Sequence, residues 1–110
     1  MKAQIRSIAQ DDIIRQYRYY LMQEDAPATA ERFLAQVHNA IKQVCKRPRI
    51  GKPKLLNNPK LLGLRSWAIN GFPAIRVYYT VQDRGLLVIR VLHDKRDINP
   101  LLEGDDVEGL

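Results

Sequence analysis

Three arginines and one histidine are the side chains of this sequence best suited to chemistry on a charged substrate. Arg65, Arg76 and Arg90 lie in the second half of the chain, and His93 follows Arg90 closely. Cleavage of RNA at a 2′-hydroxyl needs a base, an acid and a cationic group that stabilises the developing phosphate charge. Arg65, Arg90 and His93 are therefore the candidate catalytic residues if the protein is a nuclease.

His93 also has a structural interpretation, which we prefer. It opens the charged sequence His93-Asp94-Lys95-Arg96-Asp97, directly after an apolar segment. In this interpretation the imidazole bonds to a nearby carboxylate such as Asp97, or to the backbone. A comparable alternative for Arg65 is an ion pair with Asp94 or Asp97.

Other site chemistries find no support in the residue types. The one cysteine, Cys45, and the two histidines, His38 and His93, have no recognised metal-ligand spacing, so we expect no metal and no cofactor. Cys45 falls on the apolar stripe of an expected helix, which indicates a packed thiol in a reducing compartment. No phosphate-binding loop or nucleophile elbow occurs.

The composition is that of one globular domain with a strong positive charge. The chain has 110 residues, of which 45% are hydrophobic and 27% charged, and its net charge is +6. No acidic residue occurs between Glu31 and Asp83, whereas basic residues are frequent there. Such a one-signed segment attracts anionic partners, either nucleic acid or an acidic protein segment. The alternative is a basic loop that is merely solvated.

The C-terminus differs in charge from the rest of the chain. The last eight residues contain the acids Glu103, Asp105, Asp106 and Glu108. We therefore predict a single domain over residues 1–102 and an acidic, flexible tail over residues 103–110. No apolar run has the length of a signal peptide or a membrane span, so we expect a cytoplasmic protein with no membrane contact.

The apolar spacing predicts two helices in the first half of the chain. The first begins at Asp11 or Asp12, where carboxylates favour the positive end of a helix dipole. The second begins at Pro27 and ends near Arg47, and the short connection makes the pair a hairpin. The expected stripes are Ile13, Tyr17, Tyr20, Leu21 and Glu24 on the first helix, and Ala30, Phe33, Leu34, Val37, Ile41, Val44 and Cys45 on the second.

Apolar segments separated by turn sequences predict four strands, over residues 3–8, 64–69, 75–81 and 86–92, with only weak alternation in the first. In the third of these strands Ile75, Val77, Tyr79 and Val81 should face the helices, and Arg76, Tyr78 and Thr80 should share the other face. The expected fold is α+β, in the order β-α-α-β-β-β, with the helical hairpin packed on a mostly antiparallel sheet.

A series of short motifs accompanies these elements. In order they are Asp11-Asp12, Pro27-Ala28-Thr29-Ala30-Glu31-Arg32-Phe33-Leu34, Pro48-Arg49-Ile50-Gly51, Leu64-Arg65-Ser66, Tyr78-Tyr79 and Val91-Leu92-His93-Asp94-Lys95-Arg96-Asp97. Each motif alone is weak, but in this order they cover nearly the whole chain. The series resembles the ParE-like branch of the RelE/ParE toxin superfamily.

The resemblance implies a toxin of a type II toxin–antitoxin system, bound and silenced by a cognate acidic antitoxin with a DNA-binding N-terminus. ParE-like toxins act on DNA gyrase, whereas toxins of the RelE branch are ribosome-dependent mRNA endonucleases, and fold alone does not choose between them. No tyrosine follows Tyr79, which favours the gyrase interpretation. We therefore expect a protein-binding toxin without catalytic residues; an inactive relative kept as a binding module is a third alternative.

Two sets of residues follow as expected binding sites. The antitoxin should contact Arg65, Trp67, Arg76 and Tyr78, with its carboxylates meeting the arginines and its apolar residues filling a groove. The target should contact the basic residues at and after the end of the last strand, namely Arg90, His93, Lys95 and Arg96.

Overall fold

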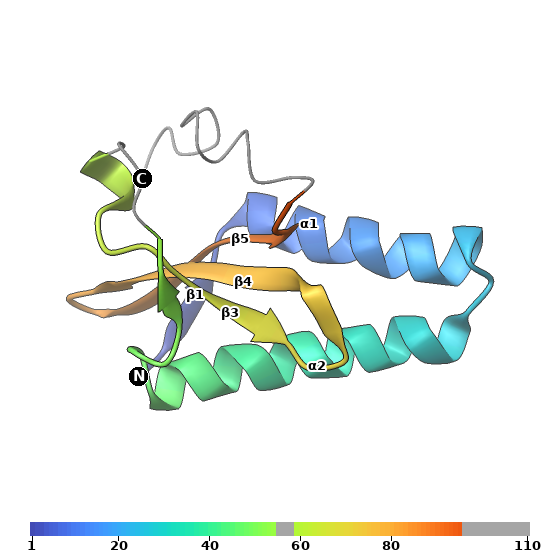
Figure 1. Cartoon of the computed structure of the whole chain (residues 1–110), viewed down its shortest axis with the longest axis horizontal. Helices are drawn as coiled ribbons and strands as arrows, with labels where there is room; N and C mark the ends of the chain where they lie inside the picture. The colour runs from blue at the N-terminus through green and yellow to red at the C-terminus, as the bar shows by residue number, and fades with distance from the viewer. Residues whose placement is uncertain (55–58, 96–110) are drawn as a thin grey trace.

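The computed structural model describes residues 1–54 and 59–95, which form two helices and a five-stranded sheet (Figure 1). The elements in chain order are β1 (Ala3–Ile5), α1 (Ser7–Arg18), the π-helical turn η1 (Tyr19–Gln23), α2 (Pro27–Lys46), β2 (Lys52–Pro53), the 3-10 turn η2 (Pro59–Leu61), β3 (Arg65–Ile69), β4 (Phe72–Gln82) and β5 (Gly85–His93). The expected order of helices and strands is therefore confirmed, with β2 as an additional short strand.

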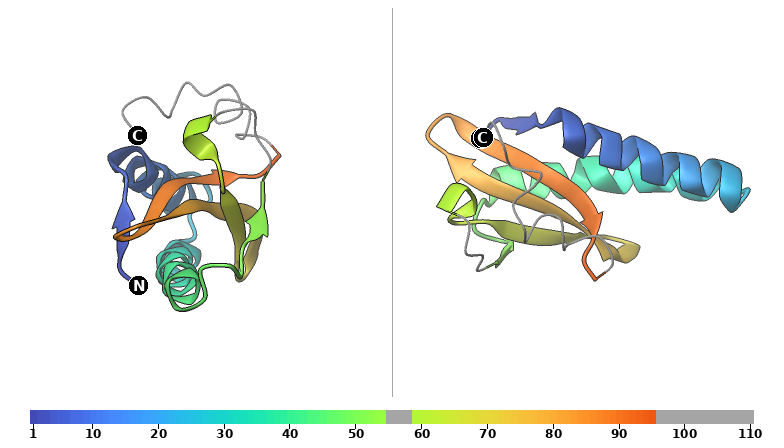
Figure 2. Two further views of the ribbon diagram at one scale, coloured as in Figure 1. Left: turned by 90° about the vertical axis from the view of Figure 1, so that its left-hand side faces the viewer. Right: turned by 90° about the horizontal axis from the view of Figure 1, so that it is seen from above.

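The sheet is mostly antiparallel, as the sequence predicts. Its strand order is β1-β5-β4-β3-β2, and only the edge strand β1 runs parallel to its neighbour β5. The two helices run side by side, and the end of the hairpin that carries η1 projects beyond the strands (Figures 1 and 2). At its C-terminal end α2 leads into the short strand β2, which forms the edge of the sheet opposite β1.

The main core lies between the helices and one face of the sheet. Five of the seven residues expected on the α2 stripe are buried, whereas Leu34 and Cys45 are half-buried; the five are Ala30, Phe33, Val37, Ile41 and Val44. A second cluster of buried residues forms around β4 and β5, and it consists of Leu61, Leu64, Tyr78, Ile89 and Leu92. Leu61, at the end of η2, and Leu64, just after it, therefore help to bury side chains that the sheet would otherwise expose.

The predicted start of the first helix is wrong. The helix α1 begins at Ser7, one turn before the expected Asp11 or Asp12, and the first strand accordingly ends at Ile5. Asp12 lies in the middle of α1 and is fully buried. The π-helical turn η1 then shifts the helical spacing, so Leu21 and Glu24 are exposed, whereas Tyr20 still packs against the Phe33 ring, with 5.6 Å between centroids.

The expected faces of β4 are confirmed except at its end. Ile75, Val77 and Tyr79 belong to the main core, but Val81 is 46% exposed, because β4 extends beyond the residues that cover its centre. Within the described residues, no helix combines the length and apolar character that crossing a membrane requires. The predicted tail over residues 103–110 lies outside the described part of the chain.

Candidate functional site

The four residues expected to bind one antitoxin segment lie on two faces of the sheet. In the β3–β4 register Arg65 lies opposite Tyr79, and Ser66 lies opposite Tyr78. Because side chains of directly paired residues share a face, Arg65 and Trp67 lie on the side of the main core, whereas Arg76 and Tyr78 lie on the other side. The structure therefore does not bring the four together in one groove.

Arg65 is held by backbone carbonyl groups and not by a carboxylate. Its Nη1 donates to the Gly51 oxygen at 2.8 Å and to the Arg49 oxygen at 3.3 Å. The ion pair with Asp94, considered as an alternative, is not formed, and Asp97 lies outside the described residues. The structural role of Arg65 is therefore to fasten the segment that follows α2.

Trp67 and Arg76 are half-buried and both are hydrogen-bonded. The Trp67 indole Nε1 donates to Gln43 Oε1 on α2 at 2.9 Å. On the opposite face, Arg76 Nε donates to Ser66 Oγ at 2.9 Å and Arg76 Nη2 donates to the Ser66 carbonyl oxygen at 3.2 Å. Each side chain keeps some exposed surface, so each remains available to a partner, but from different directions.

Tyr78 offers no surface to a partner. It is 0% exposed, and its hydroxyl has no hydrogen-bond partner. Burial raises the pKa of Tyr78 to about 12, and the nearby Asp94 carboxylate adds to this effect. Tyr78 is therefore a neutral member of the second cluster, and its expected contact with an antitoxin would require that cluster to open.

Arg90, expected at the target surface, instead belongs to a buried ion pair. It is 8% exposed, its Nε donates to Asp12 Oδ2 at 2.8 Å, and its Nη2 donates to Asp12 Oδ1 at 2.8 Å. The Asp12 carboxylate also accepts the Val91 N–H at 3.1 Å and an Arg15 N–H at 3.0 Å. The Asp12 carboxylate thus accepts hydrogen bonds from the guanidinium of Arg90 and from a backbone N–H at the edge of β5.

This network continues the hydrogen bonding of β5 after β1 has ended. β1 pairs with β5 only as far as Val88. Beyond that point Asp12 accepts from the Val91 N–H, and Gln16 Nε2 donates to the Val91 carbonyl oxygen at 2.8 Å. Two side chains of α1 therefore replace the missing neighbouring strand, which gives unpaired backbone groups their partners.

Sequence reasoning missed the Asp12–Arg90 pair, although a signal was present. Ala9, Asp12, Ile13, Gln16 and Tyr20 follow helical spacing i, i+3, i+4, i+7 and i+11. A polar residue on such a stripe predicts a buried hydrogen-bonded group, since buried charges need partners. The partner itself lies 78 residues away in the sequence and could not be read from that spacing.

His93 and Lys95 provide the surface at the end of β5. His93 is half-buried, and its Nδ1 accepts the Lys95 N–H at 3.4 Å, while the Lys95 side chain is exposed. Bonding of His93 to the backbone, one of the two structural alternatives, is therefore observed. Arg96, the fourth residue expected at the target surface, lies outside the described residues.

The three candidate nuclease residues do not converge. Arg65 pairs with Tyr79 and His93 pairs with Ile75, so the two lie two strands apart and four residues apart along β4. With the usual rise and strand spacing this separates their backbones by about 16 Å. Arg90 is already neutralised by Asp12. A single phosphate could not contact all three side chains in this arrangement.

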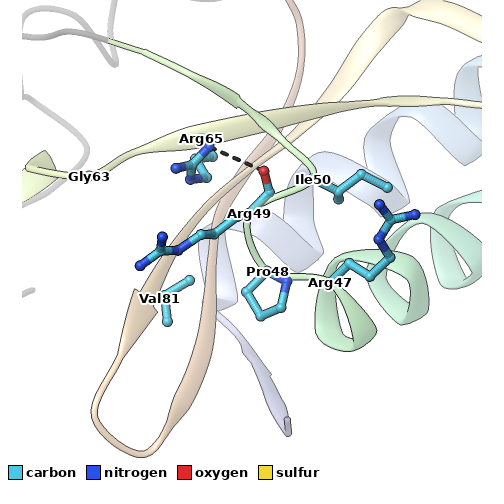
Figure 3. Close-up of a pocket in the computed structure, with 7 residues that line it drawn as sticks. All are labelled: Arg47, Pro48, Arg49, Ile50, Gly63, Arg65 and Val81. Carbon is cyan, nitrogen blue, oxygen red and sulfur yellow. Dashed lines mark hydrogen bonds between the residues drawn. The ribbon is translucent and has the colours of Figure 1, made fainter.

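An open basic cleft of about 910 Å³ lies where α2 ends (Figure 3). Its lining consists of Arg47, Pro48, Arg49, Ile50, Gly63, Arg65 and Val81. We call it the arginine cleft. In the described part of the chain no group of three His, Cys, Asp or Glu side chains is arranged to hold a metal ion.

The fold and its surfaces define a small α+β domain with a helical hairpin on a mostly antiparallel sheet and a basic cleft where α2 ends. A family model described as the ParE toxin of the type II toxin–antitoxin system parDE matches residues 4–98. The chain therefore belongs to the ParE toxin family.

Comparison with solved structures supports the same fold. A chain from a structure titled "Chromosomal ParDE TA system from P. aeruginosa" superposes with a TM-score of 0.66 and 15% sequence identity. The match covers 84% of this chain and 95% of that chain. No curated protein matches the sequence.

Proposed function

We propose that this ParE toxin acts in the cytoplasm by binding DNA gyrase, without catalytic residues or a cofactor, and that a cognate acidic antitoxin with a DNA-binding N-terminus neutralises it. The observation that carries the choice of a binding mechanism is the ion pair between Arg90 and Asp12, because it removes one of the three candidate nuclease residues from solvent. The separation of Arg65 from His93 supports the same choice.

The proposed target surface is the end of β5. His93 and the exposed Lys95 contribute to it, and Arg96 follows directly in the sequence. The sheet already holds the backbone of β5 up to His93, so a partner that binds at this end does not have to order that part of the chain. Arg90 acts behind this surface by holding β5 against α1.

The proposed antitoxin contact uses the two half-buried arginines of the sheet from separate sides. Arg65 and Trp67 accept one part of the antitoxin, and Arg76 accepts another. Reversing Arg65 or Arg76 to Glu should weaken the complex, and reversing the matching antitoxin acid should restore it. If reversal at both arginines leaves the complex unaffected, the antitoxin binds elsewhere, on the helical hairpin.

Purified gyrase tests the proposed target. The protein should inhibit supercoiling and trap cleaved DNA while leaving translation intact, and Lys95→Ala should weaken this inhibition. Lys42→Ala, which removes an exposed lysine from α2, is the matched control and should inhibit like the parent. Ribosome-dependent cutting of mRNA with no effect on gyrase would overturn the proposal in favour of the nuclease.

A further inference from the structure

We infer that the arginine cleft is a binding site for an acidic peptide segment whose carboxylates alternate with apolar side chains. Arg49 and Arg65 form its cationic wall, and Val81 and Pro48 supply its apolar surface. In Figure 3 the Arg49 side chain extends toward Val81 while Arg65 lies beside the Arg49 carbonyl oxygen, and Arg47 lies on the far side of Pro48.

The charge of the arginine cleft is uncompensated by described neighbours. Both ion pairs found in residues 1–54 and 59–95 belong to Asp12, which lies on α1. The side chains of Arg47 and Arg49 are exposed, and the lining contains no carboxylate. Guanidinium groups bind carboxylates in a planar, two-pronged geometry, so the cleft is suited to Glu or Asp side chains.

The segment that carries Arg47 and Arg49 is held in place by hydrogen bonds to Tyr79 and Arg65 of the sheet. The Tyr79 hydroxyl donates to the Pro48 carbonyl oxygen at 2.7 Å and accepts the Gly51 N–H at 3.0 Å. Arg65 Nη1 adds a bond to the Gly51 carbonyl oxygen at 2.8 Å. A Cβ at Gly51 would overlap the Tyr79 hydroxyl, so only glycine permits this close approach. The cleft is therefore formed before a ligand arrives, which lowers the entropic cost of binding.

The lining favours a peptide over nucleic acid. Single-stranded nucleic acid is bound by basic grooves that also present aromatic rings on which bases stack. The cleft is lined by no aromatic side chain, and Tyr79 beneath it is fully buried. Val81, in contrast, is 46% exposed at the rim, where an apolar peptide side chain gains from covering it.

That the natural partner is the antitoxin rests on the proposed function. That the arginine cleft binds an acidic peptide does not depend on that function. The test therefore uses a synthetic probe with the full-length toxin. A labelled peptide of about 12 alternating Glu and Val residues should bind, and its Gln and Val counterpart should bind at least about tenfold more weakly, because carboxylate contacts to guanidinium are lost. A failure of gyrase inhibition would leave this result unchanged.

Matched charge reversals locate the site of binding. Arg49→Glu should lower the affinity for the Glu peptide by at least about tenfold. Arg18→Glu makes the identical change on the exposed surface of α1 and should change that affinity by less than about twofold. Tyr79→Phe keeps the buried ring but removes the hydroxyl that holds Pro48 and Gly51 in place, so it should also lower the affinity for the Glu peptide. Equal effects of Arg49→Glu and Arg18→Glu would overturn the inference, because attraction would then depend only on net charge.

A nucleic-acid probe gives the competing outcome. A single-stranded oligonucleotide of about 20 nucleotides should bind with no dependence on Arg49 beyond that of the Arg18→Glu control. If instead the oligonucleotide binds more tightly than the Glu peptide and loses that affinity in Arg49→Glu, the arginine cleft is a nucleic-acid site and the inference is wrong.

Discussion

The buried pair of Asp12 and Arg90 gives the sharpest stability prediction. Arg90 is 8% exposed, and Asp12→Leu removes the carboxylate that pairs with its buried guanidinium. Removing one partner of a buried ion pair costs about 3–5 kcal/mol. A small domain has a total unfolding free energy of about 5–15 kcal/mol, so this single change should remove a large share of it.

A second substitution should return part of the lost stability. In Asp12→Leu with Arg90→Met both charges are gone, and the main unsatisfied group that remains is the Val91 N–H, which Asp12 accepts in the parent. One buried unsatisfied donor costs about 1–3 kcal/mol. The double variant should therefore be more stable than either single variant, by about 2 kcal/mol.

Urea denaturation of the parent, both single variants and the double variant measures this coupling. Asp11→Ala is the control, since Asp11 is the exposed neighbour of Asp12 and its loss should change stability by less than about 0.5 kcal/mol. If the losses of the two single variants simply add in the double variant, Asp12 and Arg90 do not stabilise each other and the reasoning is refuted.

Three further predictions concern the C-terminal end and the second cluster. Deleting residues 103–110 should change the unfolding free energy little and leave growth inhibition largely intact. Lys95→Ala with Arg96→Ala should lower growth inhibition while altering stability by less than about 0.5 kcal/mol; a double variant that melts and inhibits like the parent removes both residues from the target surface. The stability contributed by Tyr78 should be complete below pH 10, its ordinary pKa, and decline as the pH rises toward 12. Urea denaturation across that window should therefore show a smaller decline in Tyr78→Phe, and an equal decline would contradict the assignment.

The parts of the fold that were predictable are those with a long local pattern. α2 carries an apolar stripe through nearly its whole length, and a proline stands at its first position. β4 alternates over Ile75, Val77 and Tyr79, β5 is an almost continuous apolar run, and a turn sequence around Gly85 separates the two strands. β2 has two residues, too few for any alternation, so it could not be distinguished from a loop.

The start of α1 was mispredicted because one residue type serves two purposes. Aspartate favours the first turn of a helix, but it also accepts hydrogen bonds from a strand edge and an arginine when it is buried. The choice between these roles depends on Arg90 and Val91, which reach Asp12 only through the tertiary fold.

The division of the expected antitoxin residues has a similar origin. Alternation correctly placed Arg76 and Tyr78 together on β4, but it carries no information about which residue of β3 lies opposite them. That register includes an irregularity between Ala68 and Ile69. The sequence therefore predicted which residues of one strand share a face. It could not predict which residues of the neighbouring strand lie on the same side of the sheet.

Plasmid topology in cells that express the toxin tests the central claim most directly, because gyrase and the ribosome leave different products. With the antitoxin withheld, the account predicts relaxed and linear plasmid together with full-length mRNA, and supercoiled plasmid on co-expression of the antitoxin. Fully supercoiled plasmid accompanied by cleaved mRNA would contradict it.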